Sequence, residues 1–259
     1  MKIGVFDSGI GGLVITKSFV NKLNEYDFVY YGDTKNLPYG NKTPLQVLRY
    51  TIEAVEYLIS QDAKLIVIAC NTASAIALRY IQQRFIPQNY PEIKVLGVVI
   101  PTLEEAILPT SKKMGIIATP ATIKSQVYSI ELNKLTPELE TQEIAAPELV
   151  PAIENNDFIL AESIIKSYVS KFENVDSLVL GCTHYPLIKD IFQKHFKGVN
   201  IISSDNFMGE KLKAYLDNHP EIECVLDKTS QLKIFASEVN EHYKEVAKII
   251  FPNTKVNLA

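Results

Sequence analysis

Short apolar runs alternate with longer stretches of helical periodicity along this chain. Two of the longer stretches, 43–61 and 158–171, place apolar residues at steps of three and four, which predicts helices. The first stretch aligns Leu45, Leu48, Ile52, Val55 and Leu58. The apolar runs are rich in Val and Ile and are bounded by turn residues, which predicts strands. The predicted strands are Lys2–Phe6, Phe28–Tyr31, Leu65–Ala69, Val95–Val99, Met114–Ala118 and Ser177–Leu180.

Apolar strands that alternate with helices are typical of parallel sheets covered on both faces, so we predict the α/β class. Two segments also resemble each other. LIVIACNT at 65–72 and LVLGCTH at 178–184 each give a strand, a cysteine, a threonine and the expected start of a helix. The two cysteines lie 112 residues apart, about one small domain, which indicates two similar halves. Because ligands bind at the carboxyl ends of such strands, the halves would share one cleft with a cysteine at each lip.

The composition favours an ordinary globular protein. The 259 residues are 47% hydrophobic and 22% charged, with a net charge of −4 and an isoelectric point of about 5.7. These values argue against intrinsic disorder, a general nucleic-acid binder and a basic membrane-surface protein. The amino-terminal MKIGVFDSGIGG has no signal-peptide apolar stretch, and no apolar run reaches membrane-spanning length. We therefore expect a cytoplasmic protein with neither nucleic-acid nor membrane partners.

The three cysteines, Cys70, Cys182 and Cys224, are too few for a disulfide scaffold and have no metal-ligand spacing. No metal site is therefore predicted. The helix dipole lowers the pKa of a thiol at a helix N-terminus, so we expect Cys70 and Cys182 to favour the thiolate. Cys224 lies among acidic residues without such a setting, and we assign it a structural role.

Further polar loops follow predicted strands. DSGIGG at 7–12 would expose backbone amides at a helix start, which can bind an anion, but it has neither the P-loop nor the dinucleotide-binding spacing. YGD at 31–33 with PYG at 38–40, and TPAT at 119–122, also fit simple turns and caps. Arginine occurs only at positions 49, 79 and 84, so neutral donors would have to hold a carboxylate ligand. No loop offers an obvious Schiff-base lysine, which argues against pyridoxal phosphate.

In order and spacing, DSGIGG, YGD, PYG, CNTAS and GCTHYPLI resemble the cofactor-independent glutamate racemases. The resemblance covers Lys2 to at least Asp205. It implies two pseudo-symmetric α/β domains, residues 1–96 with 208–259 and residues 97–207, with the active site in the cleft between them. It also implies the interconversion of L- and D-glutamate without a cofactor, supplying D-glutamate for peptidoglycan. A homodimer, common in the family, is left open.

The resemblance also implies residue roles. Cys70 and Cys182 match the two thiols that remove and return the α-proton on opposite faces, Cys70 for D-glutamate and Cys182 for L-glutamate. Glu154 matches an auxiliary carboxylate among the catalytic groups. Our own hypothesis from the chemistry is that Asp7 orients or deprotonates near Cys70 and that His184 does so near Cys182. The positions that match substrate contacts are Asp7, Ser8, Tyr39, Gly40, Asn71, Thr72, Thr119, Thr122, Thr183 and His184.

The chain departs from the family pattern at Ile100, Ala118, Ala146 and the C-terminal segment Phe235-Ala-Ser-Glu. These departures concern loop shape and regulation more than the reaction. Three other functions remain open. They are a racemase of the same superfamily acting on aspartate or another amino acid, a non-catalytic amino-acid-binding module, and a redox dithiol enzyme. The last requires the two cysteine Cα atoms to lie within about 7 Å of each other.

Overall fold

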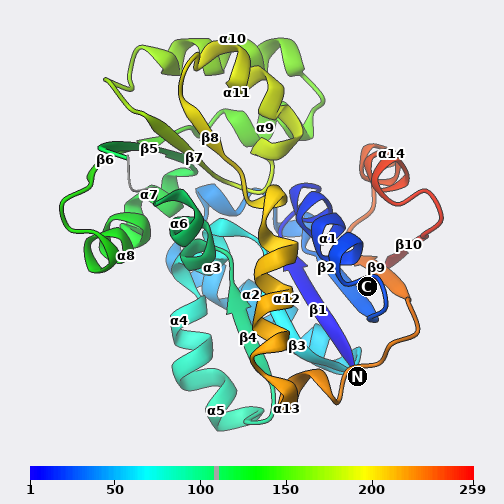
Figure 1. Ribbon diagram of the computed structural model, residues 1–259. Helices are drawn as coiled ribbons and strands as arrows, with labels where there is room; N and C mark the ends of the chain where they lie inside the picture. The colour runs from blue at the N-terminus through cyan, green and yellow to red at the C-terminus, as the bar shows by residue number, and fades with distance from the viewer. Residues whose placement is uncertain (108–110) are drawn as a thin grey trace.

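The computed structural model describes residues 1–107 and 111–259, and these residues form two parallel β-sheets flanked by helices (Figure 1). The predicted α/β class is confirmed. The first sheet has the strand order β10-β9-β2-β1-β3-β4 and the second β6-β5-β7-β8. The strands of the first sheet are β1 (Lys2–Asp7), β2 (Phe28–Gly32), β3 (Ala63–Ile68), β4 (Lys94–Gly97), β9 (Leu232–Ala236) and β10 (Val256–Leu258). Those of the second sheet are β5 (Lys113–Ala118), β6 (Glu140–Ala145), β7 (Ser177–Gly181) and β8 (Asn200–Ile202).

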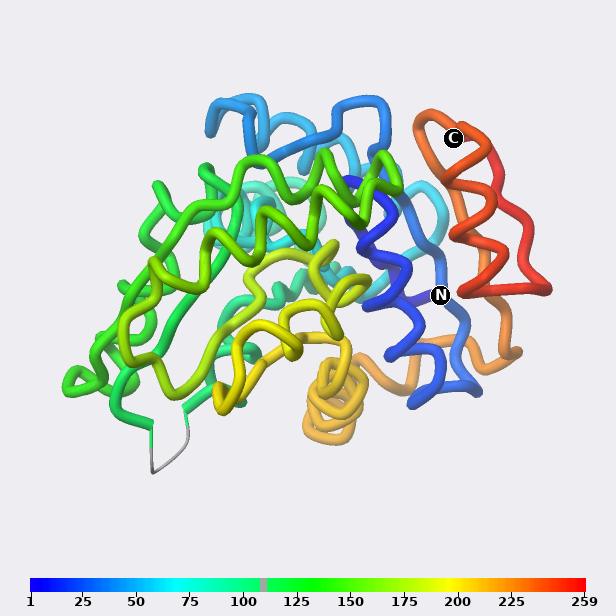
Figure 2. The backbone as a smooth tube through the Cα atoms, turned by 90° about the horizontal axis from the view of Figure 1, so that it is seen from above, coloured from blue at the N-terminus to red at the C-terminus, as the bar shows by residue number. Residues whose placement is uncertain are grey.

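The first half, built around the first sheet, draws its strands from both ends of the chain, whereas the second half uses the middle. Figure 2 shows the amino-terminal strand and the carboxyl-terminal segment on the same side of the molecule. All six predicted strands exist, but the predicted end of the strand at 95–99 was wrong. The strand stops at Gly97, and Val99 begins helix α6 (Val99–Ala106). The Val98 backbone N–H donates to Ser74 Oγ at 3.4 Å instead of to a neighbouring strand.

The two sheets share one strand arrangement. In each, the first strand along the chain, β1 or β5, has the second strand on one side and the third and fourth on the other. The chain therefore leaves the first and third strands toward opposite edges of the sheet. The place between these two strands is the topological switch point, where ligands bind in parallel sheets. Cys70 follows β3 and Cys182 follows β7, so both cysteines lie at equivalent switch points. The predicted similarity of the two halves is confirmed in this strand order.

Helices cover both faces of the first sheet. Side chains of α1 (Gly11–Lys22), α12 (Met208–Asp217) and α14 (Glu241–Ile250) pack in one hydrophobic cluster, which continues into the second half. Side chains of α2 (Pro44–Ser60) and α3 (Asn71–Ile76) pack in another cluster on the opposite face. The remaining helices are α4 (Leu78–Tyr80), α5 (Ile86–Asn89), α7 (Pro120–Ser125), α8 (Val127–Leu135), α9 (Leu149–Glu154), α10 (Phe158–Val169), α11 (Lys189–His195) and α13 (Pro220–Glu223).

The helix predicted at 43–61 is α2, and its start follows from local chemistry. Thr43 and Gln46 form a capping box, and Pro44 occupies the first turn, where its missing N–H costs nothing. The apolar face was predicted incorrectly at its beginning, because Leu45 is 75% exposed. The residues that α2 buries are Val47, Thr51, Ala54, Val55 and Leu58. The helix predicted at 158–171 is α10, whose N-cap Asp157 accepts from the Leu160 backbone N–H.

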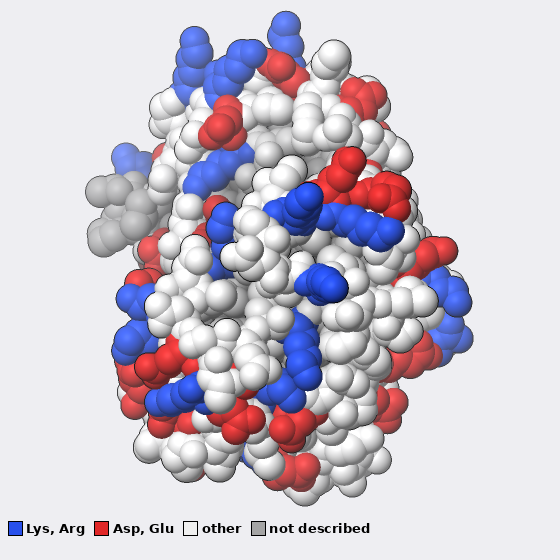
Figure 3. Space-filling model, turned by 90° about the vertical axis from the view of Figure 1, so that its right-hand side faces the viewer, with Lys and Arg blue, Asp and Glu red and all other residues white. Residues whose placement is uncertain are grey.

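Charged side chains of both signs are interspersed on the face shown in Figure 3. Within the described residues, none of the helices combines the length and the apolar character that a membrane crossing demands.

Candidate functional site

Both strand-end cysteines are buried. Cys70, the N-cap residue of α3, is 4% exposed, and Cys182 is 6% exposed. The helix start expected after each cysteine holds for Cys70 only, because a 3₁₀ turn at Tyr185–Ile188 follows Cys182 before α11 begins. Burial, reinforced by the charge of Asp7, raises the pKa of the Cys70 thiol to about 12. The predicted thiolate at Cys70 is therefore wrong, since removal from water outweighs the favourable end of a six-residue helix.

The DSGIGG loop lies beside Cys70. Ser8 Oγ is 3.5 Å from Cys70 Sγ. Asp7 is fully buried, and burial raises the pKa of its carboxyl group to about 6. Its Oδ1 accepts from the Gly9 backbone N–H at 2.9 Å, and its Oδ2 accepts from Thr183 Oγ1 at 3.0 Å. Asp7 therefore links the Cys70 side of the site to the residue that follows Cys182.

A histidine and a carboxylate lie beside Cys182. His184 Nδ1 is 3.7 Å from Cys182 Sγ, and His184 Nε2 is hydrogen-bonded to Glu154 Oε1. Burial by itself lowers the pKa of His184, but its interactions with Cys182 and Glu154 outweigh burial and hold that pKa well above the usual value. Burial likewise opposes the Glu154 charge, but the bond to His184 keeps the pKa of Glu154 low. These contacts therefore favour the imidazolium form of His184, paired with the Glu154 carboxylate.

Several contacts join the two halves around the cysteines. Glu154 Oε1 accepts from the Ile10 backbone N–H at 3.3 Å, and the Asp7–Thr183 bond forms a second link. Gly11 lies directly against the Thr183 backbone, where a Cβ atom would overlap it. In a hydroxyl cluster, Thr72 Oγ1 lies 2.9 Å from Thr119 Oγ1 and 3.1 Å from Thr122 Oγ1. A Cβ atom on Gly40 would lie 2.5 Å from Thr119 Cβ, so this close approach requires glycine.

Tyr39 takes part in a second buried network at the edge of the site. Its hydroxyl donates to Asp33 Oδ2 at 2.7 Å, and Asn36 donates to the same carboxylate. Ser237, which follows β9, donates to Asp33 Oδ1 at 2.9 Å. This bond connects the C-terminal segment, where the sequence departs from the family pattern, to the loop that carries Tyr39 and Gly40.

The structure brings together every residue that the sequence singled out for the site. The set comprises Asp7, Ser8, Tyr39, Gly40, Cys70, Asn71, Thr72, Thr119, Thr122, Glu154, Cys182, Thr183 and His184. Cys224 is exposed and stands apart.

Sequence reasoning missed three residues of the site, Asp33, Ser237 and Tyr128. Asp33 lay within a noted strand-end motif, and its position there was the available signal. Tyr128, which accepts a hydrogen bond from Asn71, has no motif around it.

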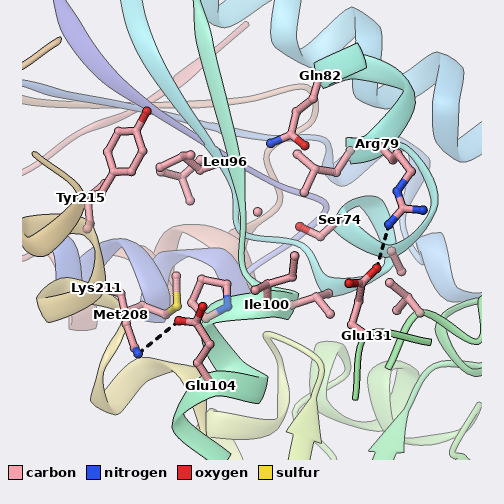
Figure 4. Close-up of a pocket in the computed structure, with 18 of the residues that line it drawn as sticks. Ser74, Arg79, Gln82, Leu96, Ile100, Glu104, Glu131, Met208, Lys211 and Tyr215 are labelled. Carbon is pink, nitrogen blue, oxygen red and sulfur yellow. Dashed lines mark hydrogen bonds and ion pairs between the residues drawn. The ribbon is translucent and has the colours of Figure 1, made fainter. Parts of the chain in front are cut away.

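A cavity of about 850 Å³ lies beside this site, and neither cysteine lines it (Figure 4). Ser74 and Leu96 of the first half and Ile100 of the second contribute to its walls, together with Met208 and Tyr215 of α12. Arg79 pairs with Glu131 at 2.8 Å and Lys211 with Glu104 at 3.4 Å around it. Cys70 and Cys182 are themselves buried, so this cavity is separate from them.

In residues 1–107 and 111–259, His, Cys, Asp and Glu side chains nowhere form a group of three or more that could hold a metal ion. The groups around the cysteines are instead hydroxyls, backbone amides, two carboxylates and one imidazolium. This set can bind a charged small molecule and move protons.

Comparisons with known proteins agree with the geometry. The sequence profile of the Asp/Glu/Hydantoin racemase family matches residues 30–205. The chain is 36% identical over 261 residues to a glutamate racemase of Sulfurihydrogenibium sp. (strain YO3AOP1), covering 98% of this chain and 95% of that one. It resembles the structure of glutamate racemase isoform RacE1 from Bacillus anthracis, with a TM-score of 0.87, 30% identity and coverage of 100% and 97%. A Francisella tularensis glutamate racemase in complex with D-glutamate also matches, with a TM-score of 0.87, 31% identity and coverage of 100% and 96%.

Proposed function

Because the chain belongs to the Asp/Glu/hydantoin racemase family, and within it to the glutamate racemases, we propose that it interconverts L- and D-glutamate without a cofactor. One observation carries the proposal. Two buried cysteines occupy equivalent strand ends of two similar sheets, each with polar partners that can influence its protonation. The substrate is a small amino acid enclosed between the two halves.

In the forward reaction, one sulfur removes the α-proton of L-glutamate and the other returns a proton to the opposite face. The electron pair of the broken C–H bond remains on the substrate until the second thiol donates its proton to the α-carbon. The His184 imidazolium beside Cys182 stabilises negative charge on that sulfur. Cys70, with a thiol pKa of about 12, holds its proton ready for donation. This state suits removal of the proton by Cys182 and donation by Cys70, giving D-glutamate.

In the reverse reaction the two sulfurs exchange roles, and Cys70 has to lose its proton first. Asp7, whose pKa is raised to about 6, is a stronger base than an ordinary carboxylate and lies close enough to affect the Cys70 charge. Ser8 Oγ, 3.5 Å from the sulfur, can donate a hydrogen bond to the thiolate once it forms. The two thiols thus depend on different helpers.

The intermediate needs donors because the α-proton is a very weak acid and negative charge develops on the substrate's carboxylate. Fixed donors in a closed site stabilise such charge more effectively than water does. Ser8 and the second N–H of the Asn71 amide can supply side-chain donors, as can the hydroxyl cluster of Thr72, Thr119 and Thr122, whereas the Thr183 hydroxyl already donates to Asp7. Gly40 places its backbone against that cluster.

The test is a single turnover of L-glutamate in heavy water. Two bases on opposite faces predict that deuterium enters the newly formed D-glutamate while the remaining L-glutamate stays unlabelled at early times. Conversion with the original proton retained would contradict the two-thiol mechanism. A chiral assay with glutamate and aspartate tests the substrate. If the protein converts aspartate faster than glutamate, aspartate is the substrate instead. Binding of glutamate with unchanged optical rotation would indicate a binding module instead.

The cellular setting is part of the proposal. The protein would work in the cytoplasm, where thiols stay reduced, and would supply D-glutamate for peptidoglycan. The domain boundaries we propose are residues 1–96 with 208–259 and residues 97–207. A homodimer remains a prediction, which the molecular mass in solution tests.

A further inference from the structure

Tyr128 reaches across the boundary between the two halves. The side chain belongs to α8 and is fully buried. Its Oη accepts a hydrogen bond of 2.9 Å from Nδ2 of Asn71, which directly follows Cys70. On its own side, Oη lies against the end of β7, because a Cβ atom on Gly181 would be 3.2 Å from it. Gly181 directly precedes Cys182, so one hydroxyl group lies between the neighbours of both thiols.

We propose that Tyr128 is a positioning residue for racemisation, whose hydrogen bond to Asn71 sets the alignment of Cys70 and Cys182 across the closed cleft. The inference rests on the proposed two-thiol function. Proton transfer to both faces of one carbon depends steeply on placement, and a displacement of about 1 Å costs about 100-fold in rate. Tyr128 forms no hydrogen bond with either thiol, so it would act through Asn71.

The same bond fixes the Asn71 amide. Asn71 is 2% exposed, and its Oδ1 has no hydrogen-bond partner among the described residues. Leaving a buried acceptor unsatisfied costs about 1–3 kcal/mol. Without the hydrogen bond to Tyr128, the Asn71 side-chain amide would therefore rotate until its oxygen met a donor. With Nδ2 held by Tyr128, the amide keeps one orientation and Oδ1 stays available. The α-ammonium group of an amino acid is a donor that can satisfy it.

The other polar links between the halves near the thiols differ in kind. In the Asp7–Thr183 and Thr72–Thr119 links both residues are assigned to substrate binding or proton transfer, and in the Glu154–Ile10 link the unassigned partner is a backbone N–H, which no substitution of a side chain removes. Tyr128 has no such assignment. Its hydroxyl can therefore be removed without deleting a proposed acid, base or substrate donor, which makes its effect on alignment measurable.

The test is Tyr128→Phe, which deletes the oxygen alone. We expect kcat/KM to fall about 10- to 100-fold, equally in both directions because the two enantiomers have equal free energy. The isotope effect measured with α-deuterated glutamate should rise, because proton transfer becomes more strongly rate-limiting. The matched control is Tyr168→Phe, which deletes a hydroxyl that donates to Glu148 Oε2 at 3.0 Å within the second half. The control should leave kcat/KM and the isotope effect unchanged.

A second measurement separates positioning from general structural support. In an Asn71→Ala background, Tyr128→Phe should cause little further loss if the hydroxyl acts through Asn71. Fully additive losses would overturn the inference. So would wild-type activity in Tyr128→Phe, or an activity loss with an unchanged isotope effect. An inactive wild-type chain in the same assay would instead overturn the proposed function, so the two failures are distinguishable.

Discussion

The surroundings of Cys70 and Cys182 differ although the two residues end equivalent strands. Cys70 has a hydroxyl at 3.5 Å and a buried carboxylate that raises its thiol pKa further. Cys182 has an imidazolium at 3.7 Å that is paired with Glu154. Equivalent backbone positions therefore carry opposite electrostatic environments. A repeated fold can place two identical side chains symmetrically while their neighbours differ, and in the mechanism we propose this difference prepares one thiol as a proton donor and the other as an acceptor.

The difference depends on both halves together. Asp7 of the first half accepts from Thr183 beside Cys182, and Glu154 of the second half accepts from Ile10 in the loop beside Cys70. Each half thus holds a polar group of the other in place. The predictions below test whether the asymmetry between the two thiols is functional, from the largest expected effect to the smallest.

Removing either thiol tests the feature that the two regions share. Cys70→Ala and Cys182→Ala should each abolish racemisation, because no other group can remove or return the proton on that face. Circular dichroism should show an intact fold in both variants, since each change removes one small buried group. Full activity in either variant would eliminate the two-thiol mechanism.

Removing the imidazolium tests the Cys182 side alone. His184→Asn should lower kcat for L-glutamate by about 100- to 1000-fold, because Cys182 then lacks the cation that stabilises its negative charge. The reduction of kcat for D-glutamate should be smaller, since Cys70 removes the proton in that direction. The KM values should change in parallel, so that kcat/KM falls equally in both directions. Steady-state kinetics in both directions provide the measurement. A loss confined to D-glutamate would reverse the assignment of the two thiols.

Removing the Asp7 charge tests how much folding stability the protein loses by burying this carboxylate beside Cys70. The pKa of Asp7 is 3.8 in an ordinary setting and about 6 here, a shift equivalent to about 3 kcal/mol. The raised pKa contributes stability that is fully present below pH 3.8 and is lost as the pH rises through about 6. Asp7→Asn avoids this loss, so its free energy of unfolding relative to wild type should increase by up to about 3 kcal/mol from pH 4 to pH 7.

Denaturant unfolding at several pH values measures this quantity, and activity should fall in the same variant. A difference that does not change with pH would show that Asp7 titrates normally in the folded protein.

Substituting the third cysteine should have the smallest effect on activity and stability. Cys224 is exposed, and its thiol donates a long hydrogen bond of 3.8 Å to the Glu221 carbonyl oxygen. Cys224→Ser should leave kcat/KM and the thermal midpoint close to wild type. A large loss of activity would show that the third thiol takes part in the site.

Much of the fold was accessible from the sequence because hydrophobic periodicity is a local property. The strands that carry Asp7, Cys70 and Cys182 were recognised as apolar runs followed by polar residues. Boundaries were less accurate where a tertiary partner decided them. Val98 leaves the strand because its N–H meets Ser74 Oγ, and Leu45 is exposed although it fits the helical period.

The protonation of the thiols could not be predicted in this way. The expected thiolate at Cys70 assumed that the helix terminus dominates, but desolvation is a property of the whole enclosure. Tyr128 and Ser237 were missed because each acts on the site through a single hydroxyl from a distant element, and no local pattern marks such a residue.

The sequence by itself determined the α/β architecture and the pairing of Cys70 with Cys182, which follow from hydrophobic periodicity and the repeated motif. The polar residues around them were implied by the resemblance to the glutamate racemases. The tertiary structure decided how these groups hold their protons, because burial raises the pKa of Cys70, whereas the contacts with Cys182 and Glu154 raise the pKa of His184. It also decided how the halves are joined, through Asp7, Glu154 and Tyr128. The physical reason is that burial and hydrogen bonding between distant segments set the charge of a side chain, and both arise only when the chain has folded.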